Sequence, residues 1–109
     1  MQVGVDIEDV ARFRRLTAKS AFTRKCYSPE EIRYCFSKPR PHEHLAARFA
    51  AKESFFKATQ ARAGFSEVEI LRAADGRPRI AVKGRIRKKA KVSISHSAHC
   101  AVAVVLVEE

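Results

Sequence analysis

The sequence predicts an α+β fold, with helices grouped in the first half and an antiparallel sheet built mainly from the second half. Apolar residues recur at helical spacing between residues 9 and 61, whereas residues 65–107 form short alternating or apolar runs bounded by turn signals. The chain has 109 residues, of which 46% are hydrophobic, so it is long enough for one domain and too apolar to be disordered. We therefore expect a single domain over residues 1–109, with one long helix and two or three short ones.

A short strand is expected near the N-terminus, because apolar and polar side chains alternate there. Val3, Val5 and Ile7 face one way, while Asp6 and Glu8 share the opposite face, about 7 Å apart along the strand. This strand should join the sheet that the second half of the chain forms.

A short helix is expected next, over residues 9–17. Val10, Phe13 and Leu16 follow at helical spacing, and Asp9 is a suitable N-cap. Its polar side carries three arginines, namely Arg12, Arg14 and Arg15.

Residues 28–37 contain a clear helix start. Ser28 is the expected cap, Pro29 takes the first helical position, and Glu31 completes a capping box. A longer helix is expected over residues 42–61, with Leu45 and Phe49 on its buried stripe.

The remaining elements read as strands. Residues 65–72 and 78–83 form a hairpin around the turn signal Asp75-Gly76, and residues 84–91 make a basic connection. Residues 92–95 and 100–107 form a last pair of strands.

The charge of the chain indicates a polyanionic partner. Lysine and arginine number 22 against 12 acidic residues, which gives a net charge of +10. The basic residues are concentrated in two stretches, residues 10–29, which hold no acid, and residues 83–91. One hypothesis is a basic nucleic-acid-binding domain, but the second stretch holds no aromatic residue on which a base could stack.

Several classes of protein are disfavoured. The longest apolar run, residues 100–107, is far shorter than the roughly 20 residues that span a bilayer, and no signal peptide is visible. Three widely spaced cysteines are typical of reduced thiols, so we expect a cytoplasmic protein with no membrane partner and no zinc site.

Three groups of residues could carry chemistry. Asp6 and Glu8 could share a hard cation such as Mg²⁺, or they could simply solvate an exposed strand face. On the long helix, Glu53 and Lys57 lie one turn apart on the same edge. They could belong to a functional site, or they could form an ordinary surface ion pair. Lys52 falls on the stripe expected to be buried, so either its stem passes the core or its ammonium meets an anion there.

The third group lies at the end of a strand, where Ser93, Ser95 and Ser97 surround His96. Three hydroxyls and an imidazole suit a phosphate, although a single loop histidine is more often structural. No Gly-rich phosphate-binding loop is present.

Taken together and in order, these motifs resemble the 4′-phosphopantetheinyl transferases. The resemblance rests on Gly4-Val5-Asp6-Ile7, on Arg48-Phe-Ala-Ala-Lys-Glu-Ser-Phe-Phe-Lys57, and on Ser93-Ile-Ser-His-Ser97 before a Val-rich last strand. It spans nearly the whole chain, and the single-domain length is similar to the holo-(acyl-carrier-protein) synthase branch. The Asp6-Ile7-Glu8 pattern is more similar to the larger, two-lobed members.

The resemblance implies an enzyme that moves the phosphopantetheine arm of coenzyme A onto a serine of an acyl carrier protein and releases adenosine 3′,5′-bisphosphate. It implies that Asp6 and Glu53 hold Mg²⁺ and that Lys57 lies near the pyrophosphate and the proton transfer. Because Glu8 shares the strand face of Asp6, we predict that it is an auxiliary ligand. Basic and polar residues are then expected to bind coenzyme A, namely Arg48, Lys52, Lys57, Ser95 and His96.

The resemblance also implies partners. The expected partner is an acidic acyl or peptidyl carrier protein, in fatty acid and lipid biosynthesis or a related pathway. Because the stretch that holds Arg12, Arg14 and Arg15 contains no acid, we predict that the carrier docks there. A homotrimer with active sites between protomers is expected, with residues 93–97 of one chain completing the Asp6 and Glu53 site of the next. Under this hypothesis no nucleic acid is bound.

Overall fold

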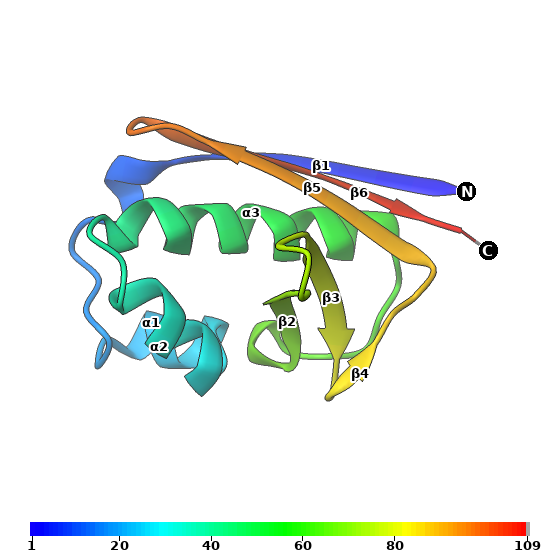
Figure 1. Ribbon diagram of the computed structural model, residues 1–109, viewed down its shortest axis with the longest axis horizontal. Coiled ribbons are helices and arrows are strands. Elements are labelled where there is room, and N and C mark those ends of the chain that lie inside the picture. Colours follow the sequence, from blue (N-terminus) through cyan, green and yellow to red (C-terminus); the bar gives the residue numbers. More distant parts are fainter. Residues whose placement is uncertain (109) are drawn as a thin grey trace.

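The computed structural model describes residues 1–108 and contains two three-stranded antiparallel sheets around one long helix. The first sheet has the order β1-β6-β5, formed by β1 (Gln2–Asp9), β6 (Cys100–Val107) and β5 (Ala90–His96). The second has the order β2-β3-β4, formed by β2 (Val68–Arg72), β3 (Pro78–Val82) and β4 (Arg85–Ile86). Helix α3 (Pro41–Ala58) runs along the first sheet, with the short helices and the second sheet on its other side (Figure 1).

The α+β class is confirmed, but the expectation of one sheet is wrong. The connection after β3 was expected to lead directly into the last strand pair. Instead Lys83 and Gly84 both have positive φ, 51° and 82°, and turn the chain back so that β4 pairs with β3. The edge of β3 is therefore occupied by β4, and β5 pairs only with β6.

Two of the expected helices are present with slightly different ends. Helix α2 (Pro29–Phe36) has the predicted capping box, because Ser28 Oγ accepts from Glu31 N and Glu31 accepts from Ser28 N. Helix α3 ends at Ala58 rather than near residue 61, because Thr59 is extended and its hydroxyl donates to the carbonyl of Phe55.

The helix expected over residues 9–17 is shorter than predicted. Only one 3₁₀ turn, η1 (Val10–Phe13), forms there. Thr17 N donates to Ser20 Oγ and Lys19 N donates to Thr17 Oγ1, and such side-chain bonds compete with helix continuation. A separate helix that was not predicted, α1 (Ala21–Cys26), follows. A second 3₁₀ turn, η2 (Phe65–Glu67), occupies the start of the strand expected over residues 65–72.

Strand β1 lies against α3 with its polar face inward. Gly4 makes this possible, because a Cβ there would lie 1.9 Å from the carbonyl oxygen of Ser54 on α3. Ser54 Oγ donates to Ala50 O on α3 and to Ala103 O on β6, which holds the helix on the sheet. The alternation of β1 is thus as predicted, and the carboxylates of Asp6 and Glu8 lie on the covered face.

The outer face of the first sheet is apolar and exposed. Val3, Val5 and Ile7 of β1 are 61%, 53% and 65% exposed, and Val104 and Leu106 of β6 lie beside them at 37% and 39%. Large apolar side chains gathered on one sheet face are typical of a surface that another protein covers. Among residues 1–108, no helix is long and apolar enough to cross a membrane.

Candidate active site

The candidate residues form two groups at opposite edges of the first sheet. The carboxylate cluster, at the β1 edge, contains Asp6, Glu8 and Glu53 with Lys57. The basic pocket, at the β5 edge, is lined by residues that include Arg48 and His96. Because β6 lies between β1 and β5, the two edges are separated by about 10 Å, twice the usual strand spacing.

In the carboxylate cluster, the side chain of Asp6 projects from β1 toward α3. Lys57 Nζ donates to the carbonyl of Val5 at 2.9 Å and lies 3.4 Å from Asp6 Oδ1. The other carboxylate oxygen, Asp6 Oδ2, is buried and accepts no hydrogen bond from an N–H group of residues 1–108. A buried acceptor without a partner costs free energy, so this atom is suited to a cation that the chain itself does not supply.

Glu8 is buried beside Asp6 and pairs with Arg12. Its pKa is raised from 4.5 to about 7, chiefly by desolvation, then by the hydrogen bond and negative charge of Asp6, and to a lesser extent by Glu53. Arg12 opposes this shift in the pKa of Glu8. The negative charges of Asp6 and Glu53 therefore converge on Glu8, as expected where a divalent cation is to be bound.

The donor set of the carboxylate cluster fits Mg²⁺ rather than a metal that needs a complete protein cage. Among residues 1–108, no three His, Cys, Asp or Glu side chains are arranged to hold a metal ion on their own. Mg²⁺ commonly binds through one or two carboxylates and completes its shell with water and substrate phosphates. Asp6 has the free oxygen for such a site, whereas Glu8 already has a cationic partner in Arg12.

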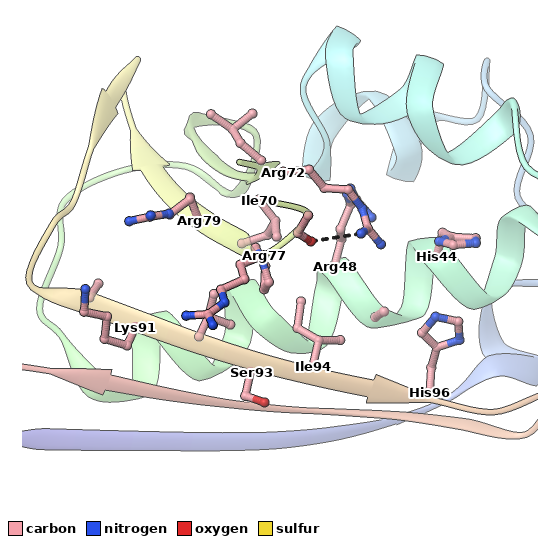
Figure 2. Close-up of a pocket in the computed structure, with 16 residues that line it drawn as sticks. His44, Arg48, Ile70, Arg72, Arg77, Arg79, Lys91, Ser93, Ile94 and His96 are labelled. Atoms are coloured by element: carbon pink, nitrogen blue, oxygen red, sulfur yellow. Dashed lines mark hydrogen bonds between the residues drawn. The ribbon is translucent and has the colours of Figure 1, made fainter. Parts of the chain in front are cut away.

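The basic pocket encloses about 570 Å³ between α3, the β2–β3 hairpin and β5. Figure 2 shows His44 and His96 at one end and Arg79 and Lys91 at the other, with further arginines between them. The basic and imidazole side chains that line it are His44, Arg48, Arg72, Arg77, Arg79, Lys91 and His96. Among residues 1–108, no acidic side chain lines this pocket, so its field favours an anion with several charges.

Arg48 is the buried member of this set. Its guanidinium lies 4.2 Å from the centre of the Tyr34 ring, and its Nε is buried with no hydrogen-bond partner in the described part of the chain. Within the described residues, Arg48 Nε is thus an unpaired donor at the β5 edge, and Asp6 Oδ2 is an unpaired acceptor at the β1 edge. Arg72 differs, because its Nη1 donates to the carbonyl of Gly76 in the β2–β3 turn.

Residues 93–97 divide between the two faces of the sheet. His96 lines the pocket, where its Nδ1 lies 3.1 Å from Glu43 Oε1. Ser95, next along the strand, is exposed and does not line the pocket, because successive side chains point to opposite faces. Within one chain, Ser95 and His96 therefore lie on opposite faces of the strand, and their joint contact with a phosphate stays a prediction.

The expectation that Lys52 lines a coenzyme A cleft is also wrong. Its side chain is fully buried, and Nζ donates to Glu31 Oε1 at 2.6 Å, Cys26 O at 2.6 Å and Phe65 O at 2.9 Å. All three ammonium donors are used, so none remains for a ligand. The anion that Lys52 meets is Glu31, whose Oε2 also accepts from Ile70 N.

The three arginines of the expected docking helix are not equivalent. Arg12 is paired with Glu8 and lies 5.6 Å from the ring centres of both Phe13 and Phe49, so it belongs partly to the carboxylate cluster. Arg14 and Arg15 are exposed. These two form the part of the basic surface that is free to meet a partner.

The sequence alone did not point to the arginines of the β2–β3 hairpin or to Glu43. Arg72, Arg77 and Arg79 flank the predicted Asp75-Gly76 turn, and the alternation of residues 77–79 places two of them on one face. The sequence signal for Glu43 is only its place in the first turn of a helix. Acidic residues are common there because they interact favourably with the helix dipole, so the position does not indicate a functional role.

Comparison with known proteins identifies relatives over the whole chain. The sequence profile of the 4′-phosphopantetheinyl transferase superfamily matches residues 2–105. A holo-(acyl-carrier-protein) synthase from Chloroherpeton thalassium is 36% identical over 118 aligned positions, which cover 99% of this chain and 98% of the relative.

Solved structures agree in fold. A holo-(acyl-carrier-protein) synthase from Bacillus anthracis in complex with CoA (3′,5′-ADP) superposes with a TM-score of 0.81 at 27% identity, covering 99% of this chain and 96% of the other. The corresponding protein from Neisseria meningitidis gives a TM-score of 0.82 at 29% identity, with coverages of 99% and 98%.

Proposed function

The chain belongs to the 4′-phosphopantetheinyl transferase superfamily, and from this premise we propose that it transfers 4′-phosphopantetheine from coenzyme A to a serine of an acyl carrier protein. One observation carries the proposal. The carboxylate cluster and the basic pocket each contain a buried polar atom that has no hydrogen-bond partner among the described residues, an acceptor at Asp6 Oδ2 and a donor at Arg48 Nε. Coenzyme A with a divalent cation would supply the partner that each of these atoms lacks.

The reaction needs alignment and charge neutralisation more than covalent help from the protein. The serine hydroxyl attacks the phosphorus that bears the pantetheine and gives up its proton to solvent as the new P–O bond forms. The bond from that phosphorus to the bridging oxygen of the pyrophosphate breaks, and this oxygen leaves as part of adenosine 3′,5′-bisphosphate. In this chain Arg48 and His96 would hold the nucleotide end, and Lys57 would neutralise the pyrophosphate.

Asp6 and Glu53 would hold Mg²⁺, with Glu8 beside them. The ion, when bound, would neutralise the oxygens that gain charge as the bond breaks. Asp6 fits this role because one of its oxygens is free, and because Lys57 restrains the other. Glu8 would act as an auxiliary ligand only after exchanging its contact with Arg12.

We further propose that the working unit is a homotrimer with each site shared between neighbours. The separation of the carboxylate cluster and the basic pocket at opposite edges of one sheet supports this arrangement. The exposed apolar face of that sheet supports it as well, since burying its five large apolar side chains would stabilise an assembly. The carboxylate cluster of one protomer would then act on coenzyme A held by the basic pocket of the next.

Mixing two inactive variants tests the shared site. His96→Ala removes the pocket side and Asp6→Ala removes the cluster side. If sites are shared around a closed ring, every mixed trimer has one intact site in three, so random mixing in equal amounts restores roughly one quarter of the wild-type rate. A mixture as inactive as its components, or an active monomer in light scattering, would contradict the shared site.

The carrier protein is expected to be acidic and to dock near Arg14 and Arg15, because their charges are exposed on the segment that follows the strand of Asp6 and Glu8. The three cysteines, Cys26, Cys35 and Cys100, are free, which supports a reducing, cytoplasmic location.

The proposed activity is tested by mass spectrometry of an apo carrier protein after incubation with the chain, coenzyme A and Mg²⁺. We expect the carrier to gain about 340 Da, the mass of one phosphopantetheine, on its serine. Replacing Mg²⁺ with a chelator should abolish the gain. No gain with carriers of fatty acid, polyketide or peptide synthesis would overturn the proposal, and retention of polynucleotides would favour the nucleic-acid hypothesis instead.

A further inference from the structure

At one end of the basic pocket, His96 is paired with a carboxylate, Glu43, which does not line the pocket and which the proposed chemistry does not use. Glu43 lies in the first turn of α3 and is buried, with a side chain 12% exposed. His96 is the last residue of β5, and its Nδ1 lies 3.1 Å from Glu43 Oε1. Two elements far apart in sequence are therefore joined at the pocket by one hydrogen bond.

This hydrogen bond determines which nitrogen of His96 carries a proton. An ionised carboxylate only accepts, so Nδ1 must be the donor. The two ring nitrogens point in divergent directions, so Nε2 is left as the polar atom of the ring that can meet a ligand. His96 lines the pocket and has no other hydrogen bond within residues 1–108.

The neighbouring aromatic rings restrict the His96 imidazole further. His44 meets it edge-on with ring centres 5.2 Å apart, and Tyr34 meets His44 in the same way at 5.8 Å. Burial, followed by the charges of His96 and Arg48, lowers the pKa of His44. His44 is therefore an uncharged neighbour, and within residues 1–108 only His96 of the two lies within hydrogen-bond distance of a carboxylate.

We propose that Glu43 is a positioning residue, which holds His96 by Nδ1 so that Nε2 donates to a phosphate of coenzyme A in the basic pocket. The inference rests on the proposed function, since it assigns the pocket to coenzyme A. When His96 donates to both groups, its doubly protonated ring lies between two anions, the Glu43 carboxylate and the phosphate. Glu43 acts through His96 and does not itself touch the ligand.

A simpler role for Glu43 would be to stabilise the start of α3. Acids in the first helical turn interact favourably with the backbone dipoles, and Arg40 Nη1 lies 3.9 Å from Glu43 Oε2. The exposed Arg40 can be changed without touching His96, which gives a matched control. Glu30 in the first turn of α2 offers a second control, because among the described residues it pairs with the exposed Arg33 alone.

The test compares coenzyme A binding by calorimetry for wild type, Glu43→Gln, His96→Gln and the double variant, with Arg40→Gln and Glu30→Gln as controls. Gln keeps the size of Glu43 and removes its charge. We expect Glu43→Gln to weaken binding roughly tenfold, as loss of a charge-assisted hydrogen bond does, and the double variant to bind no more weakly than His96→Gln alone. In transfer assays the Michaelis constant for coenzyme A should rise while the rate at saturation is kept.

A second measurement follows the position of the proton directly. Nitrogen-15 NMR of labelled histidine should show His96 protonated at Nδ1 in the wild type and shifted toward the Nε2–H form in Glu43→Gln. Identical His96 spectra in the two proteins would overturn the proposal, as would unchanged affinity or a loss equal to that of Arg40→Gln. If wild type binds no coenzyme A, the proposed function fails, whereas the NMR comparison still decides whether Glu43 holds His96.

Discussion

Replacing Gly4 with alanine should separate β1 from α3 and disable the carboxylate cluster. The new Cβ would lie 1.9 Å from Ser54 O, 2.9 Å from Ser54 C and 3.1 Å from Ala58 N, all backbone atoms. Ordinary contact begins near 3.4 Å, so β1 must move away by about 1.5 Å at this point. Neither side can yield by rotating a side chain, because the crowded atoms belong to the helix backbone.

The cost has two parts. Overpacking of this kind costs about 1–3 kcal/mol. A displacement of about 1.5 Å also breaks the hydrogen bond of 2.9 Å from Lys57 to Val5 O, which adds about 1 kcal/mol. We therefore expect the free energy of unfolding to fall by about 2–4 kcal/mol and the melting temperature to fall by roughly 10–20 °C. Transfer activity should fall even where the Gly4→Ala protein is fully folded, because Asp6 lies two residues beyond Gly4 on the same strand and moves with it.

Thermal denaturation followed by circular dichroism measures the first effect, and carrier modification at a temperature where both proteins are folded measures the second. Gly64→Ala is the matched control, since a Cβ there meets only Glu67 Oε1 at 3.7 Å and the backbone φ of −81° suits alanine. A Gly4→Ala protein that melts within about 2 °C of Gly64→Ala would refute the close approach of β1 to α3.

Three further outcomes are expected. The pKa of Glu8 is raised in the folded state from 4.5 to about 7, so the free energy of unfolding of the metal-free protein should fall by up to about 3 kcal/mol as the pH rises from 4.5 through 7. Urea titrations of Glu8→Gln should not show this fall with pH. Addition of Mg²⁺ should restore the stability of the wild type at pH 8. Lys52→Met leaves the Glu31 carboxylate buried without its cation and should lower the free energy of unfolding by about 3–5 kcal/mol, yet leave coenzyme A affinity of the folded protein unchanged in calorimetry. Charge reversal at Arg14 and Arg15 should raise the Michaelis constant for the carrier protein in a salt-dependent way and leave coenzyme A binding intact. A loss of coenzyme A affinity as large as the loss of carrier affinity would contradict a docking role.

Local patterns predicted the elements of this fold better than their pairing. The capping box of Ser28 and Glu31 gave the start of α2, and the alternation of Val3, Val5 and Ile7 gave β1. The pairing of β4 with β3 depends on the positive φ of Lys83. Lysine rarely adopts a positive φ, so the sequence does not predict this turn.

The site was predicted in parts, for different reasons. Strand periodicity correctly put Asp6 and Glu8 on one face, but it could not say that Gly4 makes this the covered face. Helical spacing correctly put Lys52 on the buried stripe, whereas the family resemblance suggested a ligand role that its three intramolecular hydrogen bonds exclude. Glu43 could not be found, because its role depends on where the end of β5 lies in space.

The exposed apolar face of the first sheet has a consequence for how the rate depends on the amount of protein. If a site needs residues from two chains, a lone chain has no turnover, and only assembled chains contribute. In the dilute regime the fraction of chains assembled into trimers varies with roughly the square of total concentration. Halving the amount of chain would then lower the rate per chain to roughly one quarter, so that small changes in expression produce larger changes in output.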